Sequence, residues 1–114
     1  MTLASLRAVA IFLAAGLVIH VPVARAQSAE AEVLFREGRK LIKAGKLGPG
    51  CDKLEASERI EPSIGTLLNL GDCREQLGEL ATAWAAFSKA EAMAKRSGDP
   101  KRQSEAAKRA AQLE

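Results

Sequence analysis

The chain has few of the residues that enzymes and metal sites use. It contains no tyrosine and one histidine, His20, which we expect to be removed with an N-terminal leader. A serine or cysteine nucleophile would then lack its usual base, and there is no C-x-x-C pair for a metal. Carboxylates three residues apart occur at Glu55, Glu58 and Glu61, but interleaved basic residues are typical of a solvated helix face. The sequence therefore predicts no enzyme, no metal site and no cofactor.

The N-terminus carries an apolar run that is too short to span a membrane comfortably. Ala8 to Ile19 has no charge, whereas a membrane span needs about 20 residues. After Pro22, the segment Ala24-Arg25-Ala26 matches the small-x-small pattern of signal-peptidase cleavage. We therefore expect residues 1–26 to be a signal peptide cleaved after Ala26. The protein would be periplasmic or secreted, without a membrane span. The alternative is an uncleaved N-terminal membrane anchor.

A large excess of one charge is also missing. The chain has 17 lysine and arginine residues against 14 aspartate and glutamate residues, and Arg7 and Arg25 leave with the leader. The remaining 88 residues are close to neutral, so we expect no nucleic-acid partner, because that function needs clustered positive charge. The basic residues between Lys95 and Arg109 alternate with acidic ones and are typical of a solvated helix face.

Turn signals divide the rest of the chain into five helical segments, and no segment shows the period-two alternation of a strand. Ser28 is a candidate N-cap for the first helix, and Gly45 is its candidate left-handed C-cap. Pro49 suits the first turn of the second helix, Ser63 caps the third, and Asp99 starts the fifth. The sequence thus predicts an all-α fold. The expected helix ranges are 28–44, 48–60, 63–77, 80–97 and 100 to about the C-terminus.

A pattern recurs 33 residues apart within these helices. Leu34, Gly38, Gly45, Leu47 and Leu54 recur as Leu67, Gly71, Gly78, Leu80 and Phe87. Such a period is typical of helical proteins whose units stack to bury a shared core.

The pattern resembles the tetratricopeptide repeat, an antiparallel helix pair of about 34 residues. The first unit matches at Leu34, Gly38, Leu41, Gly45, Leu47, Gly50, Leu54, Ser57 and Pro62. The second unit matches at Leu67, Leu70, Gly71, Gly78, Leu80, Ala83, Phe87 and Ala90. Glu37, Arg74 and Gly50 depart from the family pattern, which usually has leucine, an aromatic residue and alanine at these positions.

The resemblance implies two helix–turn–helix units, about 31–62 and 64–97, and a capping helix over about 100–113. Together they would form a right-handed α-solenoid in one domain, 27–114. Small residues at Gly38, Gly50, Gly71 and Ala83 would let neighbouring helices approach closely. Large residues would fill the core, although Trp84 has a ligand platform as its alternative role. The expected core is Leu34, Leu41, Leu47, Leu54, Leu67, Leu70, Leu77, Leu80, Trp84 and Phe87.

In this family, the first helix of each unit lines a concave groove that holds a partner segment. The positions carried over are Phe35, Arg39, Ile42 and Lys43, with Glu32, and then Leu68, Asn69, Asp72 and Glu75, with Gln76. Apolar side chains would supply affinity, and charged ones would fix the register. Alternatively, Phe35 and Leu68 only pack against a neighbouring helix. We do not expect the clamp by which some repeats grip a terminal carboxylate, because only Asn69 fits it.

The resemblance also places Cys51 on the second helix and Cys73 on the third, which pack together in this family. An exported chain meets an oxidising compartment, so we predict a disulfide between them. The alternative is two buried thiols that act as small apolar side chains.

These observations predict an exported protein–protein interaction module, acting as an adaptor or scaffold in a cell-envelope complex. Its partner would be a protein or peptide. One alternative is a self-associating structural protein, a homo-oligomer whose open ends stack on copies of itself. Another is a repeat module anchored in the membrane by its N-terminal segment.

Overall fold

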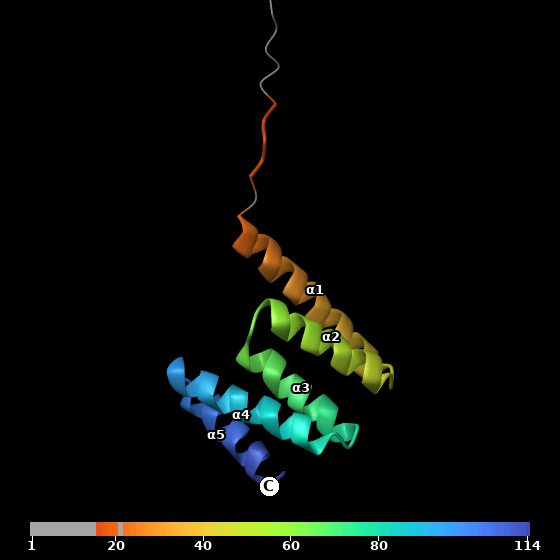
Figure 1. The fold of residues 1–114 in the computed structure, drawn as a ribbon, viewed down its shortest axis with the longest axis vertical. Helices are drawn as coiled ribbons and strands as arrows, with labels where there is room; N and C mark the ends of the chain where they lie inside the picture. The colour runs from red at the N-terminus through yellow and green to blue at the C-terminus, as the bar shows by residue number, and fades with distance from the viewer. Residues whose placement is uncertain (1–15, 21) are drawn as a thin grey trace, which may run out of the picture.

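The computed structural model describes residues 16–20 and 22–114, and within them the chain forms five helices and no strand (Figure 1). The helices are α1 (Val23–Lys43), α2 (Leu47–Ile60), α3 (Ile64–Gln76), α4 (Leu80–Arg96) and α5 (Pro100–Ala111). Each helix packs against the next one along the chain. The predicted all-α fold is therefore confirmed. Residues 1–15, which carry most of the expected leader, lie outside the described residues.

Three of the helices end in the same way, at a glycine with a positive φ. Gly45, Gly78 and Gly98 have φ of 80°, 76° and 69°, a backbone conformation that only glycine adopts at little cost. The Gly45 N–H donates to the carbonyl of Ile42 at 3.0 Å, and the next N–H, of Lys46, donates to Leu41 at 2.9 Å. The same two bonds recur at the other two glycines, which is the Schellman arrangement. Hence α1–α2, α3–α4 and α4–α5 share one kind of turn.

The connection between α2 and α3 is different, because Pro62 prevents α2 from continuing. Ser63 has an extended backbone, and its Oγ accepts a hydrogen bond from the Thr66 N–H at 3.0 Å. The predicted N-cap is therefore confirmed. At the other end of the chain, Asp99 caps α5 by accepting from the Arg102 N–H at 3.0 Å.

The start of α1 differs from the sequence prediction. The helix begins at Val23 directly after Pro22, so Ser28 lies inside it and is not the N-cap. Proline fits at a helix start but not within a helix, and nothing between Val23 and Ser28 stops the helix from extending back to it. The expected cleavage point after Ala26 therefore falls in the first turns of α1.

The core lies between α2, α3 and α4, where Leu54, Leu67, Leu70 and Phe87 are buried. The helices approach closely at glycines, as predicted. A Cβ built on Gly71 would lie 2.6 Å from Cε1 of Phe87. Gly38 and Gly50 face each other across α1 and α2, since a Cβ on either would lie 3.0 Å from the other's carbonyl oxygen.

Three of the expected core residues are wrong. Leu77, Leu80 and Trp84 are 38%, 50% and 42% exposed. The buried side of α4 is instead its alanine-rich stripe, with Ala83 and Ala90 fully buried. Close packing on α3 and α5 favours these small residues, and the bulky ones lie on the adjacent face. Leu34, Leu41 and Leu47 are only partly buried.

Candidate functional site

Most of the predicted groove residues line one hollow between α1 and α3. Its volume is about 140 Å³, and its walls are Arg39, Ile42 and Lys43 from α1 and Asn69, Asp72, Cys73 and Gln76 from α3. Spacings of three and four residues place each set on one face of its helix. The structure thus brings Arg39, Ile42, Lys43, Asn69 and Asp72 together, as the register implied.

A second hollow lies along the same two helices, nearer the start of α1. It measures about 230 Å³ and is lined by Ser28, Ala31, Glu32, Phe35, Glu61, Ser63, Gly65 and Thr66. Phe35 therefore belongs to this hollow, one turn before Arg39, whose guanidinium lies 5.8 Å from the centroid of the Phe35 ring. We call the two hollows together the α1–α3 groove.

The apolar groove residues are shared between the groove and the core. Phe35, Ile42 and Leu68 are partly buried and pack against the buried core. The alternative role for Phe35 and Leu68 was packing against a neighbouring helix, and part of each side chain does pack in this way. Leu68 lines neither hollow, whereas Phe35 and Ile42 expose part of their side chains to the groove.

Arg109 of α5 pairs with the α3 wall of the groove, a contact that the sequence interpretation missed. Its guanidinium pairs with the Asp72 carboxylate, donates to Oε2 of Glu75 at 2.5 Å, and lies 4.6 Å from the centroid of the Phe87 ring. Burial acts to lower the pKa of this guanidinium, but the hydrogen bonds to Glu75 and Asp72 outweigh burial and raise it. The group is therefore charged at any physiological pH, and Glu75 is tied to α5 outside both hollows.

A solvated face was the wrong interpretation for Arg109, and the repeat could have shown this. Lys43, Gln76 and Arg109 are spaced 33 residues apart. The first two line the hollow between α1 and α3. Extending the register by one more unit would have placed Arg109 at the equivalent position on α5.

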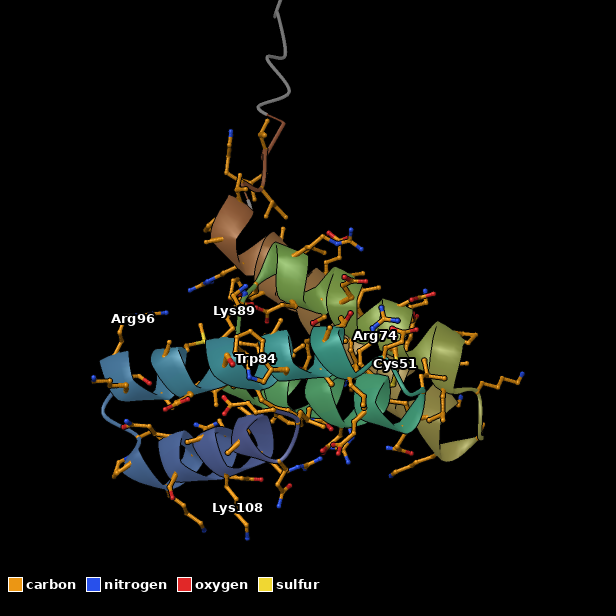
Figure 2. The ribbon with its side chains drawn as sticks, turned by 60° about the horizontal axis from the view of Figure 1, so that its bottom comes forward. Cys51, Arg74, Trp84, Lys89, Arg96 and Lys108 are labelled. Carbon is orange, nitrogen blue, oxygen red and sulfur yellow. A yellow bond between two sulfur atoms is a disulfide. The ribbon has the colours of Figure 1, made fainter. Side chains whose placement is uncertain are left out.

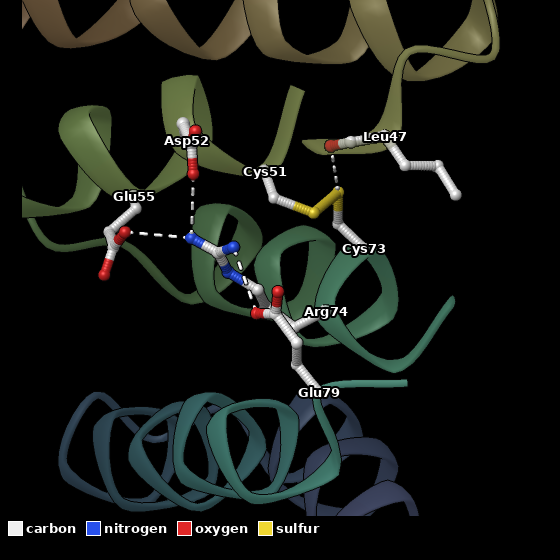
Figure 3. Close-up of polar contacts among 7 residues, drawn as sticks. All are labelled: Leu47, Cys51, Asp52, Glu55, Cys73, Arg74 and Glu79. Carbon is white, nitrogen blue, oxygen red and sulfur yellow. Dashed lines mark hydrogen bonds and ion pairs between the residues drawn. A yellow bond between two sulfur atoms is a disulfide. The ribbon is translucent and has the colours of Figure 1, made fainter. Parts of the chain in front are cut away.

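A disulfide lies beside the groove and joins α2 to α3 (Figure 3). The sulfur atoms of Cys51 and Cys73 are 2.08 Å apart, so the predicted pairing is present at disulfide distance. Both residues are almost completely buried, and Cys73 also lines the smaller hollow. Cys73 Sγ contacts the carbonyl oxygen of Leu47 at 3.5 Å, but a disulfide sulfur has no hydrogen to donate. The covalent bond thus links the α1–α2 hairpin to the wall of the groove.

Arg74 follows Cys73 in α3. Its side chain is 10% exposed and reaches three carboxylates (Figure 3). It donates to Asp52 at 3.2 Å, to Glu55 at 2.9 Å and to Glu79 at 3.1 Å. Arg74 therefore ties α2, α3 and the start of α4 together through charge-assisted hydrogen bonds.

The solvated-face interpretation is also wrong for Glu58, which is 7% exposed. Its Oε2 accepts from the Ser63 N–H at 3.1 Å. Its Oε1 lies 3.0 Å from Lys89 Nζ, close enough for an ion pair, although the direction of the contact is poor for a hydrogen bond. The neighbouring Ser57 Oγ donates to the Ala31 carbonyl at 2.7 Å. These buried polar groups hold α2 against α1 and α4.

The described residues contain no cluster of histidine, cysteine and acidic side chains that could hold a metal ion. Among the helices of residues 22–114, none is long and apolar enough to cross a membrane. Comparison with protein-family models, with curated proteins and with solved structures finds no match for this chain.

Proposed function

We propose that this chain is an exported, tetratricopeptide-like interaction module that holds a segment of a protein partner in the α1–α3 groove. α1–α2 and α3–α4 would be its two units, with α5 as the capping helix of a right-handed solenoid. Three identical glycine turns and the register that runs from Lys43 to Arg109 support this arrangement. It would act as an adaptor or scaffold in a cell-envelope complex.

The observation that carries the proposal is the lining of the groove. Side chains from two helices that are not adjacent in the chain face one hollow, and they combine partly exposed apolar groups with polar and charged ones. A ligand-binding surface needs this combination, because apolar groups supply affinity and polar groups supply orientation. The two hollows lie one turn of α1 apart, at Arg39 and at Phe35, so one extended or helical segment could lie along both.

Export is supported by the Cys51–Cys73 pair. Disulfides persist in oxidising compartments and are rare where thiols are kept reduced. A pair that is this deeply buried and joins two helices is part of the folded structure. We therefore propose a periplasmic or secreted location, with cleavage after Ala26.

Capture of partners from the native cell envelope tests the groove. The variant Phe35→Ala with Arg39→Ala removes an apolar anchor and a cation, and it should abolish capture while far-UV circular dichroism stays unchanged. Its matched control, Leu80→Ala with Arg96→Ala, makes the same two kinds of change on α4 and should bind normally. Loss of capture in the control alone would move the binding surface to α4 and refute the groove.

Self-association is a second candidate, and one observation favours it. Leu77, Leu80 and Trp84 expose large apolar surface at the α3–α4 turn and along α4, and a further helix of a longer repeat would cover it. Open repeat ends of this kind need a cap or a partner to stay soluble. Light scattering of the chain alone separates the two candidates. A stable monomer supports the adaptor, and a mass that grows with concentration supports assembly.

A further inference from the structure

In the smaller hollow of the α1–α3 groove, the acidic side chain has an ion-pair partner within residues 22–114 and the basic ones do not, and this difference indicates the chemistry of a bound segment. On the α3 wall, the carboxylate of Asp72 faces the hollow but is paired with Arg109, as is Glu75. On the α1 wall, Arg39 and Lys43 line the same hollow. None of the ion pairs in residues 22–114 involves either of them.

The nearby acidic groups of α1 do not reverse this balance. Glu32 lies 3.6 Å from Arg36, one turn away on the same helix. Glu37 is paired with Lys53 of α2 at 3.0 Å and lines a hollow on the other side of α1. Arg39 and Lys43, one turn apart, therefore have no ion-pair partner among the described residues. Across the hollow they face Asn69 and Gln76, which carry no charge, and Asp72, which is already paired with Arg109.

We infer that the groove binds a segment carrying aspartate or glutamate side chains, which pair with Arg39 and Lys43, next to a bulky apolar residue that contacts Phe35 or Ile42. This inference rests on the proposed function of the groove. Residues four apart on a helix present their side chains about 6 Å from one another, so carboxylates on one side of a bound segment can reach both cations. Exposed charge pairs of this kind give specificity that salt weakens.

The test is selection from a phage library of random dodecapeptides, each joined to the coat protein by its C-terminal end, so that no free terminal carboxylate is offered. The target is the full chain with its disulfide formed. In peptides selected on this chain, the ratio of acidic to basic residues should be at least about threefold higher than in the naive library. On the variant Arg39→Glu with Lys43→Glu, the ratio should fall below that of the naive library.

The chain offers a closely matched control. Arg96 and Lys108 point outward from α4 and α5, away from the groove (Figure 2). Arg96→Glu with Lys108→Glu changes the total charge by the same amount and exchanges the same residue types. It should select acidic peptides as the unaltered chain does. Equal loss of acidic preference in both variants would show that net charge alone attracts the peptides, and would overturn the inference.

A third variant, Gln76→Trp, separates this inference from the proposed function. The indole would fill the smaller hollow without changing any charge. The selected peptides could fail to bind Gln76→Trp and yet show no enrichment in acidic residues. This result would overturn the inference about charge and leave the groove as the binding site. Peptides that still bind Gln76→Trp, or recovery of none above background, would refute the groove and the inference together.

Discussion

The closeness of α3 and α4 makes Gly71→Ala a sharp test of the fold that supports the groove. Gly71 lies in α3 opposite Phe87, which is fully buried. A Cβ at this position would lie 2.6 Å from Cε1 and 2.7 Å from Cζ of that ring. The ring is also covered by the guanidinium of Arg109, which lies 4.6 Å from its centroid. The ring therefore has little room to move away from the new methyl group.

Gly65→Ala in the same helix provides the comparison, because no heavy atom lies within 4 Å of its built Cβ. Carbon atoms in contact normally lie about 3.5–4.0 Å apart, so Gly71→Ala must displace Phe87 by about 1 Å. Overpacking of this kind costs about 1–3 kcal/mol. Both variants also gain up to about 1 kcal/mol from the higher helix propensity of alanine. The propensity gain is smaller for Gly65, which lies in the first turn of α3, so it cancels only in part. Gly71→Ala should therefore be roughly 0.5–3 kcal/mol less stable than Gly65→Ala.

Urea unfolding of the oxidised chains, followed by circular dichroism, measures this difference through the midpoint at unchanged slope. Adding Phe87→Leu to Gly71→Ala should recover part of the loss, because leucine has no ring to collide with the new methyl group. Equal stability of the two single variants, or a Gly71→Ala variant that is the more stable one, would refute the close approach of α3 and α4.

Three further predictions concern the disulfide, the α5 cap and the groove charges. Replacing Cys51 and Cys73 by serine opens a loop of sequence separation 22 and should lower the free energy of unfolding by about 3 kcal/mol through chain entropy. In the natural chain, alkylation before reduction should leave both cysteines unmodified by mass spectrometry, and labelling of both would refute the pairing. The hydrogen bond from the Arg102 N–H lowers the pKa of the Asp99 carboxyl below its usual 3.8. The cap therefore stabilises the fold fully above that pH, and this stabilisation is lost as the pH falls through the lower pKa of the folded state. The difference in urea midpoint between Asp99→Ala and the natural chain should close in acid, and a difference that widens would contradict this. Arg109→Met frees both carboxylates of α3 and should reduce the acidic enrichment of selected peptides, whereas unchanged enrichment would show that these carboxylates do not face the ligand.

The helix ends could be predicted from the sequence because their causes are local. Gly45, Gly78, Ser63 and Asp99 each act within one turn of their own position, through a left-handed backbone or a side-chain cap. The prediction failed at the start of α1, where a candidate cap was present but the helix extends past it. There, Pro22 rather than Ser28 determines where the helix begins.

The residues that were mispredicted depend on neighbours far away in the chain. Leu80 and Trp84 look like core residues because they are large and apolar, yet the helix spacing at α4 admits only alanines beside Phe87. Glu58 and Arg109 look solvated because charged residues surround them in the sequence. Their partners, Lys89 and the acidic side chains of α3, come from other helices. Local composition cannot show such pairs, although the 33-residue register already contained the position of Arg109.

Photo-crosslinking in the native cell envelope tests the central claim most directly. A small aliphatic diazirine amino acid, which is no bulkier than the glutamine it replaces, would stand in the wall of the groove at position 76. The same amino acid at position 96 would stand outside the groove, at the end of α4. The proposed function predicts a discrete adduct at position 76 that disappears when Arg39 and Lys43 are changed to glutamate, and none at position 96. Adducts of equal yield at both positions, or at position 96 alone, would contradict a binding groove between α1 and α3.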